Sequence, residues 1–239
     1  MSVVKAAIGD AILTSMWVFS TPMNGVLTTV IATYLGVQAT PLAGLFISTI
    51  IATILVLLFS LIGKVLGGAS FNPSTTLSFY AAGLKPESSL ISMAARFPAQ
   101  AAGGLGGAMA ILQVMPSQYK HRLKGPSLKV DLHTGAIAEG VLTFVFSFAL
   151  LFIILKGPKN GLLKVWLLAV ATVGLFVAGS GYTGPSMNPA NAFGWAFVNN
   201  RHNTWEHFYV YWICPFTGST LAAWIFRFFF ISPIKQKKA

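Results

Sequence analysis

The sequence predicts an all-α membrane protein with six transmembrane helices and two re-entrant half-helices, arranged as an inverted repeat. Three observations predict this class. Apolar types make up 55% and charged types 9% of the 239 residues, whereas a soluble domain carries about 25% charged residues. The mean hydropathy is +0.72. Several apolar segments are long enough to cross a bilayer, and one short motif occurs twice. This composition excludes a soluble enzyme, a disordered chain and a coiled coil.

The charge balance is strongly basic, with 16 Lys and Arg against 5 Asp and Glu and a net charge of +11. In a soluble protein such an excess would suggest nucleic acid. In a chain this apolar we assign it to basic loops that meet lipid headgroups, and we expect no nucleic-acid partner. The single Cys214 excludes an internal disulfide and a cysteine-based metal cluster. We expect no metal, no cofactor and no enzymatic activity, because no catalytic triad or phosphate loop occurs.

Six segments have the length of roughly 20 apolar residues that about 30 Å of hydrocarbon requires. They are residues 7–34, 43–66, 93–115, 134–155, 163–183 and 205–231. The alternation typical of a β-barrel is absent, so we expect helices. Residues 67–83 and 184–199 are apolar but too short to cross. A helix from Asn72 to about Gly83 would be roughly 16 Å long, about half the hydrocarbon thickness. Both stretches are therefore predicted to be half-helices.

An internal repeat relates the two halves of the chain. The motif G-x-S-x-N-P occurs at 68–73 and again at 184–189, 116 residues later. Two further pairs of segments match near that separation, namely 100–103 with 215–218 and 10–14 with 139–143. Because each half contains three spans, the second half enters from the opposite face. The half-helices are therefore predicted to approach the midplane from opposite sides.

Each half-helix has a recognisable start, Asn72-Pro73 in the first half and Asn188-Pro189 in the second. Asn is a preferred N-cap, and Pro is favoured at the first helical position. The capping oxygen is tied to the backbone, so we expect each amide NH₂ to point freely into a lumen. Two positive helix ends and two donors suit a neutral molecule such as water and repel cations. The loop carbonyls predicted to line the passage are those of Gly68, Ala69, Ser70, Gly184, Pro185 and Ser186.

Over nearly its whole length the chain resembles the aquaporins, or major intrinsic proteins. The resemblance is carried by the two Asn-Pro boxes, Asp10, Glu139, Ala99-Gln100, Gly103, Tyr182-Thr183-Gly184, Trp212, Pro215 and Gly218. One box alone would be weak evidence, whereas two boxes in inverted halves with matching flanks are specific. The resemblance implies one aquaporin-like channel domain over 1–239, with repeat halves of about 1–115 and 134–231 and a basic tail at 232–239.

Three departures from the family pattern stand out. The first box reads Asn72-Pro73-Ser74, where the family usually has Ala third. The second reads Asn188-Pro189-Ala190 and is followed by Asn191, where most members place Arg. Ser70 stands where His is frequent. These departures resemble the first subgroup of plant small basic intrinsic proteins. That resemblance implies water as permeant, an endoplasmic reticulum membrane, and a homotetramer with one pore in each subunit.

The resemblance also implies where a selectivity constriction would lie. Pro185 and Asn191 follow from the second box, and Phe176 lies twelve residues before its asparagine. The second span contributes Ala52 or Thr53. We expect Phe176 to narrow this set sterically. Without the Arg, proton exclusion is expected to rest more on the central asparagines, and glycerol, urea and hydrogen peroxide stay open as permeants.

Asp10 and Glu139 lie inside spans, where an ionisable group is by default a functional hypothesis. The resemblance favours a structural role, with each carboxylate accepting hydrogen bonds from a pore loop, because a buried carboxylate needs such partners. Three functions therefore stay open. They are a passive channel, a proton-coupled secondary transporter that uses one of these carboxylates, and a non-conducting membrane scaffold.

The basic residues predict that both termini are cytosolic. Eleven Lys and Arg, including Arg96, then face the cytosol, against five on the opposite side, which agrees with the positive-inside rule. In the tail, Lys235 and Lys237 resemble a dilysine retrieval signal for the endoplasmic reticulum. The alternative is a basic flank that meets anionic lipid.

Overall fold

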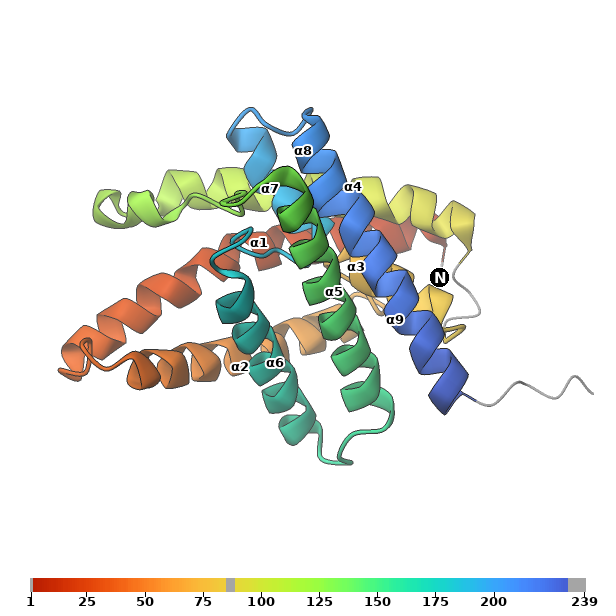
Figure 1. The fold of residues 1–239 in the computed structure, drawn as a ribbon, viewed down its shortest axis with the longest axis horizontal. Coiled ribbons are helices and arrows are strands. Elements are labelled where there is room, and N and C mark those ends of the chain that lie inside the picture. Colours follow the sequence, from red (N-terminus) through yellow and green to blue (C-terminus); the bar gives the residue numbers. More distant parts are fainter. Residues whose placement is uncertain (1, 85–88, 232–239) are drawn as a thin grey trace, which may run out of the picture.

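The computed structural model describes residues 2–84 and 89–231, which fold into a bundle of helices (Figure 1). The long helices are α1 (Val3–Tyr34), α2 (Pro41–Val65), α4 (Leu90–Val114), α5 (Leu132–Leu155) and α6 (Gly161–Gly179). A sixth long segment joins α8 (Trp205–Phe208), η2 (Tyr209–Ile213) and α9 (Cys214–Phe230). The short elements are α3 (Pro73–Ala81), α7 (Pro189–Val198) and the 3₁₀ turn η1 (Ser117–Arg122). The predicted six long helices and two half-helices are present.

Capping residues set helix starts that lie two to four residues before the predicted apolar segments. The Ser2 hydroxyl accepts from the N–H of Lys5 (3.3 Å), so α1 begins at Val3 rather than at residue 7. Asp131 caps α5 and Asn160 caps α6 in the same manner. Polar caps precede the hydrophobic run because their side chains satisfy the free N–H groups of the first turn.

Within residues 2–84 and 89–231, five helical segments are long and apolar enough to cross a membrane, namely α1, α2, α5, α6 and Trp205–Phe230. Helix α4 has 25 residues and at 1.5 Å per residue is about 38 Å long. It is less apolar because it carries Arg96, Gln100 and several glycines. Arg96 and Gln100 donate hydrogen bonds to Asp10 of α1, and Gly103 and Gly107 lie against the α1 backbone.

The last span is not one uninterrupted α-helix, as 205–231 was expected to be. Tyr209–Ile213 forms a π-helical turn directly before α9, whose second residue is Pro215. Proline has no N–H to donate to the preceding turn, and a wider turn accommodates the missing bond. The turn directs Tyr211, which is 4% exposed, into the interior.

The two halves pack in corresponding ways. Helix α1 packs on α4, and α5 packs on α9, while each half-helix lies against the third span of the opposite half, α7 on α4 and α3 on α9. A Cβ atom on Gly103 would overlap the carbonyl of Ala11, and one on Gly218 would overlap the carbonyl of Gly140. In Figure 1 the helices α1, α2 and α4 run across the direction of α5, α6 and α9.

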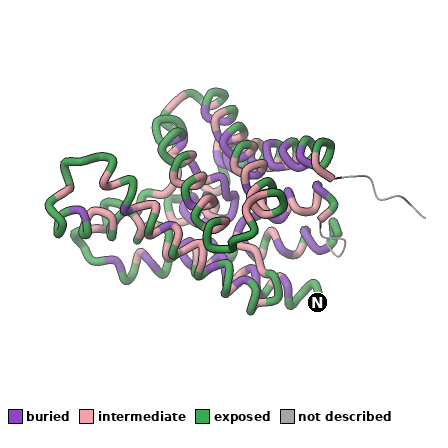
Figure 2. The backbone as a smooth tube through the Cα atoms, turned by 90° about the horizontal axis from the view of Figure 1, so that it is seen from below, coloured by how far each residue is buried: buried purple, intermediate pink, exposed green. Residues whose placement is uncertain are grey.

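Burial is concentrated where the halves cross. Figure 2 shows the buried residues in the middle of the molecule and exposed residues along its outer faces and loops. In the most apolar stretch of α2 and of α6, 11% of the residues are buried, against 33% in that of α1 and of α5. Their outward faces are apolar, as a helix in contact with lipid requires. The residues of the half-helix junction, among them Asn72, Asn188, Asp10 and Glu139, belong to this buried middle.

Candidate functional site

Asn72 and Asn188 begin the two half-helices in the same way. Both have extended backbones, with φ of −142° and −146°, and each is followed by proline at the first helical position. The side-chain oxygen of Asn72 accepts from the N–H groups of Ser74 (2.9 Å) and Thr75 (3.4 Å). Asn188 accepts from the two equivalent groups at 3.1 and 3.3 Å. The caps predicted from the sequence are present.

The same two side chains join the halves. Nδ2 of Asn72 donates to the carbonyl of Met187, and Nδ2 of Asn188 donates to the carbonyl of Phe71, both at 2.9 Å. Each acceptor directly precedes the opposite asparagine, so the two N-terminal helix ends meet. We expected both amides to be free, and this is wrong in part, because one N–H of each is used across the junction. The second N–H of each amide has no acceptor among the described residues.

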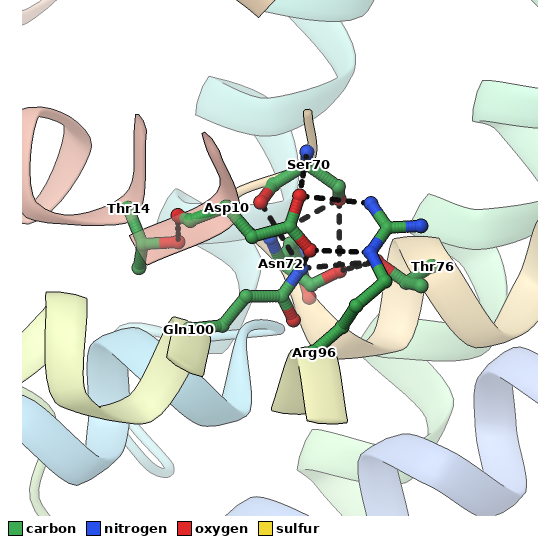
Figure 3. Close-up of polar contacts among 7 residues, drawn as sticks. All are labelled: Asp10, Thr14, Ser70, Asn72, Thr76, Arg96 and Gln100. Atoms are coloured by element: carbon green, nitrogen blue, oxygen red, sulfur yellow. Dashed lines mark hydrogen bonds and ion pairs between the residues drawn. The ribbon is translucent and has the colours of Figure 1, made fainter. Parts of the chain in front are cut away.

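Asp10 of α1 anchors the first loop, as Figure 3 shows. The side chain is fully buried. Its Oδ1 accepts from the N–H of Ser70 (2.8 Å), and its Oδ2 accepts from Nε2 of Gln100 (2.8 Å). The hydroxyl of Ser70 in turn donates to the carbonyl of Asn72 (3.3 Å). The expected hydrogen bond from pore loop to carboxylate is present, two residues from the half-helix cap.

Arg96 is not at the surface of the protein, although the predicted topology counted it among the basic residues on the cytosolic side. It is 6% exposed, and its guanidinium holds Asp10 through two contacts, Nε to Oδ2 at 2.6 Å and Nη2 to Oδ1 at 2.8 Å (Figure 3). A charged carboxylate buried in the bundle needs a cation or several donors, and α4 turns Arg96 toward it. Without Arg96, the predicted cytosolic side keeps ten basic residues against five, and cytosolic termini stay a prediction.

Glu139 of α5 anchors the second loop through uncharged donors. Its Oε1 accepts from the N–H groups of Ser186 (3.0 Å) and Met187 (2.5 Å), and its Oε2 accepts from the hydroxyl of Thr183 (2.8 Å). The Tyr211 hydroxyl donates to the Thr183 carbonyl (3.0 Å). Sequence reasoning did not assign roles to Thr183 or Tyr211. The repeat pairs them with Gly67 and Arg96, which are different residue types, so the repeat alignment gives no signal for these roles.

The loop carbonyls separate into two groups. That of Ser70 accepts from Nε2 of Gln100 (3.0 Å) and is therefore turned toward α4 rather than toward a passage, contrary to the prediction. The carbonyls that accept no hydrogen bond from the described residues are those of Gly68, Ala69, Gly184, Pro185 and Ser186. Gly68 has φ +83°, a conformation that glycine adopts without strain. These unpaired carbonyls stay candidates for contact with a permeant.

The three helical residues predicted for the constriction have different surroundings. Phe176 on α6 is 53% exposed, so other residues cover only part of its ring. Only Ala169 and Gly179 of α6 are buried, because this helix packs over a small part of its surface. Thr53 donates its hydroxyl to a carbonyl of its own helix (2.7 Å), whereas Ala52 is buried at 7% exposure.

The loop residues predicted for the constriction lie close to the second box. Pro185 is buried, and Nδ2 of Asn191 donates to the hydroxyl of Ser186 (3.0 Å). The Oδ1 of Asn191 is buried and has no hydrogen-bond partner among the described residues. Asn191 thus braces the second loop on one side and keeps an unused acceptor on the other.

Two residues of the first box have surroundings that the sequence did not indicate. Ser74 is fully buried, and its hydroxyl has no hydrogen-bond partner among the described residues. The ring of Phe71 stacks on Trp17, with centroids 4.2 Å apart and an interplanar angle of 20°, and Phe59 meets both rings edge-on. This aromatic cluster holds the residue whose carbonyl accepts from Asn188.

The lysine tail and possible metal ligands complete the set of predicted features. Lys235 and Lys237 lie outside the described residues. Within the described part of the chain, no three His, Cys, Asp or Glu side chains come together in a way that could hold a metal ion. The junction therefore offers amide donors, backbone acceptors and helix dipoles, with both carboxylates occupied by anchoring contacts.

Comparison with known proteins gives consistent matches. The family described as major intrinsic protein matches residues 1–226. Aquaporin SIP1-1 of Oryza sativa subsp. japonica is 55% identical over 241 residues, with 100% of this chain and 98% of that protein covered. Aquaporin SIP1-1 of Arabidopsis thaliana is 50% identical, with 100% and 98% covered. The X-ray structure of the aquaglyceroporin from Plasmodium falciparum superposes with a TM-score of 0.71 at 17% identity, covering 95% of this chain and 96% of that one, which shows the shared fold.

Proposed function

Because the chain belongs to the major intrinsic protein family of membrane channels, which are not enzymes, we propose that it conducts water passively across an intracellular membrane. The observation that carries the proposal is the pair of crossed hydrogen bonds from Asn72 to Met187 and from Asn188 to Phe71. These bonds hold two capped helix ends face to face and leave one N–H on each amide for a permeant. The names of the similar aquaporins support the same assignment.

The electrostatics at the junction favour a neutral permeant. Each helix N-terminus carries a partial positive charge, and the two ends meet at one place. A water molecule can accept from the free amide N–H groups and donate to the unpaired loop carbonyls, whereas a cation would be repelled by both helix ends. Asn191 adds no charge where most family members carry Arg. We therefore expect proton and cation exclusion to depend on the central asparagines.

The carboxylates support an anchoring role over proton transport. Asp10 is held by Arg96, Gln100 and the Ser70 amide, and Glu139 accepts three hydrogen bonds from its own loop. A proton carrier has to exchange its partners during each cycle. Exchange here would release the loops that hold the asparagines.

Stopped-flow shrinkage of proteoliposomes distinguishes the three functions. A channel gives fast, weakly temperature-dependent water flux, and Asn188→Asp lowers that flux or admits cations because a carboxylate replaces a donor. The matched control is Asn160→Asp, the same change at the exposed cap of α6, and it should leave the flux unchanged. Lipid-like permeability of the wild-type protein would indicate a scaffold. Flux that is driven by a proton gradient and abolished by Glu139→Gln would indicate a transporter.

The range of permeants is tested with the same vesicles. Water, glycerol, urea and hydrogen peroxide are compared at equal protein content. Because Phe176 is exposed and Asn191 is neutral, we expect slow passage of small neutral solutes beside water. Water flux with complete exclusion of all three solutes would contradict this expectation and would place a narrow filter elsewhere.

We propose a homotetramer in the endoplasmic reticulum, on the resemblance to small basic intrinsic proteins and on the pattern of Lys235 and Lys237. The apolar outer faces of α2 and α6 are compatible with contacts between subunits. Native mass spectrometry of the full chain tests the tetramer. Lys235→Ser with Lys237→Ser should redistribute the protein to later membranes, whereas the control Lys238→Ser should not. Retention of the double variant would count against the signal.

A further inference from the structure

The two carboxylate anchors are related by the repeat but built from different residues. Asp10 of the first half corresponds to Glu139 of the second. At the separation of 115 residues that relates the third spans, Arg96 corresponds to Tyr211. At the separation of 116 residues that relates the boxes, position 67 of the first loop corresponds to Thr183. The residue types at these three positions therefore all differ between the two halves.

The second half uses an uncharged relay. Tyr211 donates to the carbonyl of Thr183 (3.0 Å), and the hydroxyl of Thr183 donates to Glu139 (2.8 Å). Among the described residues, the third span thus reaches the carboxylate only through the loop residue. Glu139 is fully buried and has no cation partner among the described residues.

The first loop cannot build the same relay. Gly67 has φ +76°, a left-handed conformation that strongly disfavours a β-branched residue such as threonine. Glycine supplies no side-chain donor, and Asp10 is one methylene shorter than its counterpart. Beside the Ser70 N–H, the donors that take the place of the Thr183 hydroxyl come from the third span itself. Arg96 is long enough and presents two N–H groups in the planar geometry that matches a carboxylate.

We propose that Arg96 is a positioning residue of the channel. Its ion pair with Asp10 fixes the acceptor for the Ser70 amide, and Ser70 is linked to the backbone of Asn72 (3.3 Å). The first pore loop therefore depends on a buried charge pair, whereas the second loop depends on a neutral relay. The functional part of this inference rests on the proposed water conduction.

Four variants in reconstituted full-length protein test the proposal: Arg96→Gln, Asp10→Asn, the double variant with both changes, and Tyr211→Phe as the matched control in the second half. Hydrogen exchange measured by mass spectrometry follows residues 66–72 and 183–188 separately. Stopped-flow gives water permeability at equal protein content. The exchange measurement reports on loop fixation whatever the permeant is.

Arg96→Gln should speed exchange in 66–72 by on the order of tenfold and leave 183–188 unchanged, because loss of an anchor opens the loop locally. Its water permeability should fall, on the order of tenfold for a small displacement of a positioning group. Tyr211→Phe should speed exchange in 183–188 alone. The double variant should recover slow exchange in 66–72, since no charge is left unpaired and two amides can still bond.

The proposal is overturned if Arg96→Gln leaves exchange in 66–72 unchanged or speeds both loops equally. It is also overturned if the double variant exchanges as fast as Arg96→Gln, because the two charges are then not coupled. If Arg96→Gln does not fold, hydrogen exchange in the double variant tests the proposal instead. A folded double variant with slow exchange in 66–72 then supports the pairing of Arg96 with Asp10. Wild-type protein without water flux would refute the proposed function, while the exchange data would still decide the role of Arg96.

Discussion

Asn72 and Asn188 each donate a hydrogen bond to the backbone carbonyl directly before the other, with both donor–acceptor distances at 2.9 Å. Each side chain also caps its own half-helix through its oxygen. One amide thus stabilises its own helix end and the loop of the opposite half at the same time. The position of either box consequently depends on the folding of both halves.

Replacing Asn72 with serine would separate its capping role from its hydrogen bond to the opposite half. Asn72→Ser keeps an N-cap of similar quality, but its shorter side chain has no amide to reach the Met187 carbonyl. We expect a loss of about 1 kcal/mol in the free energy of unfolding and a higher proton leak relative to water flux. Thermal unfolding and a pH-sensitive dye in proteoliposomes measure the two effects. Asn160→Ser, at a cap without a cross-half bond, is the control, and equal losses in both variants would argue against the crossed bonds.

Gly103→Ala tests the close crossing of α1 and α4. The added methyl would overlap the backbone carbonyl of Ala11, which cannot move aside as a side chain could. We expect a loss of about 1–3 kcal/mol in the free energy of unfolding. Gly174→Ala has nothing within 4 Å of its new atom and should gain up to about 1 kcal/mol, because alanine favours helix. Chemical denaturation in detergent compares the two, and similar stability of both variants would refute the crossing.

Ser74→Ala tests whether the departure in the first box matters for conduction. The Ser74 hydroxyl is buried without a hydrogen-bond partner among the described residues, so its removal should be neutral or stabilising by about 1 kcal/mol. Water permeability should stay unchanged, since the side chain is fully buried. Ser186→Ala should instead lower stability, because that hydroxyl donates to the Asn188 carbonyl (2.7 Å). A change of solute selectivity in Ser74→Ala would show that the hydroxyl reaches the permeant.

Asp131 caps α5 outside the membrane-spanning segment, and we expect the stability of this helix start to fall in acid. Hydrogen bonds from the side chain and then the backbone of Thr134 hold the pKa of Asp131 below its ordinary value of 3.8. A pKa that is lower in the folded state stabilises the protein above pH 3.8, and this contribution is lost as the pH falls through the lower, folded value. Between pH 7 and pH 3, the melting temperature should fall less in Asp131→Asn than in the wild-type protein. In Asn160→Asp the melting temperature should fall more in acid than in the wild-type protein. Identical pH profiles of the two variants would contradict the assignment.

Local rules account for the parts of the candidate site that sequence could predict. Asn72-Pro73 and Asn188-Pro189 read as helix starts because capping depends on residues one to three positions apart. Arg96 was misplaced because its position near the start of α4 resembles a surface flank, and its direction depends on how α4 is rotated against α1. The exposure of Phe176 could not be predicted, because an alignment to a box does not show which way α6 faces.

The sequence by itself determined the apolar spans, the two capped half-helices and the inverted repeat, since each follows from length, hydropathy or a motif within a few residues. Only the tertiary structure decided that the asparagine amides are shared between halves, that Asp10 takes a cation and that Glu139 takes a neutral relay. These partners lie between 28 and 117 residues apart. Bonds over such separations depend on helix rotation and loop path, which no local pattern contains.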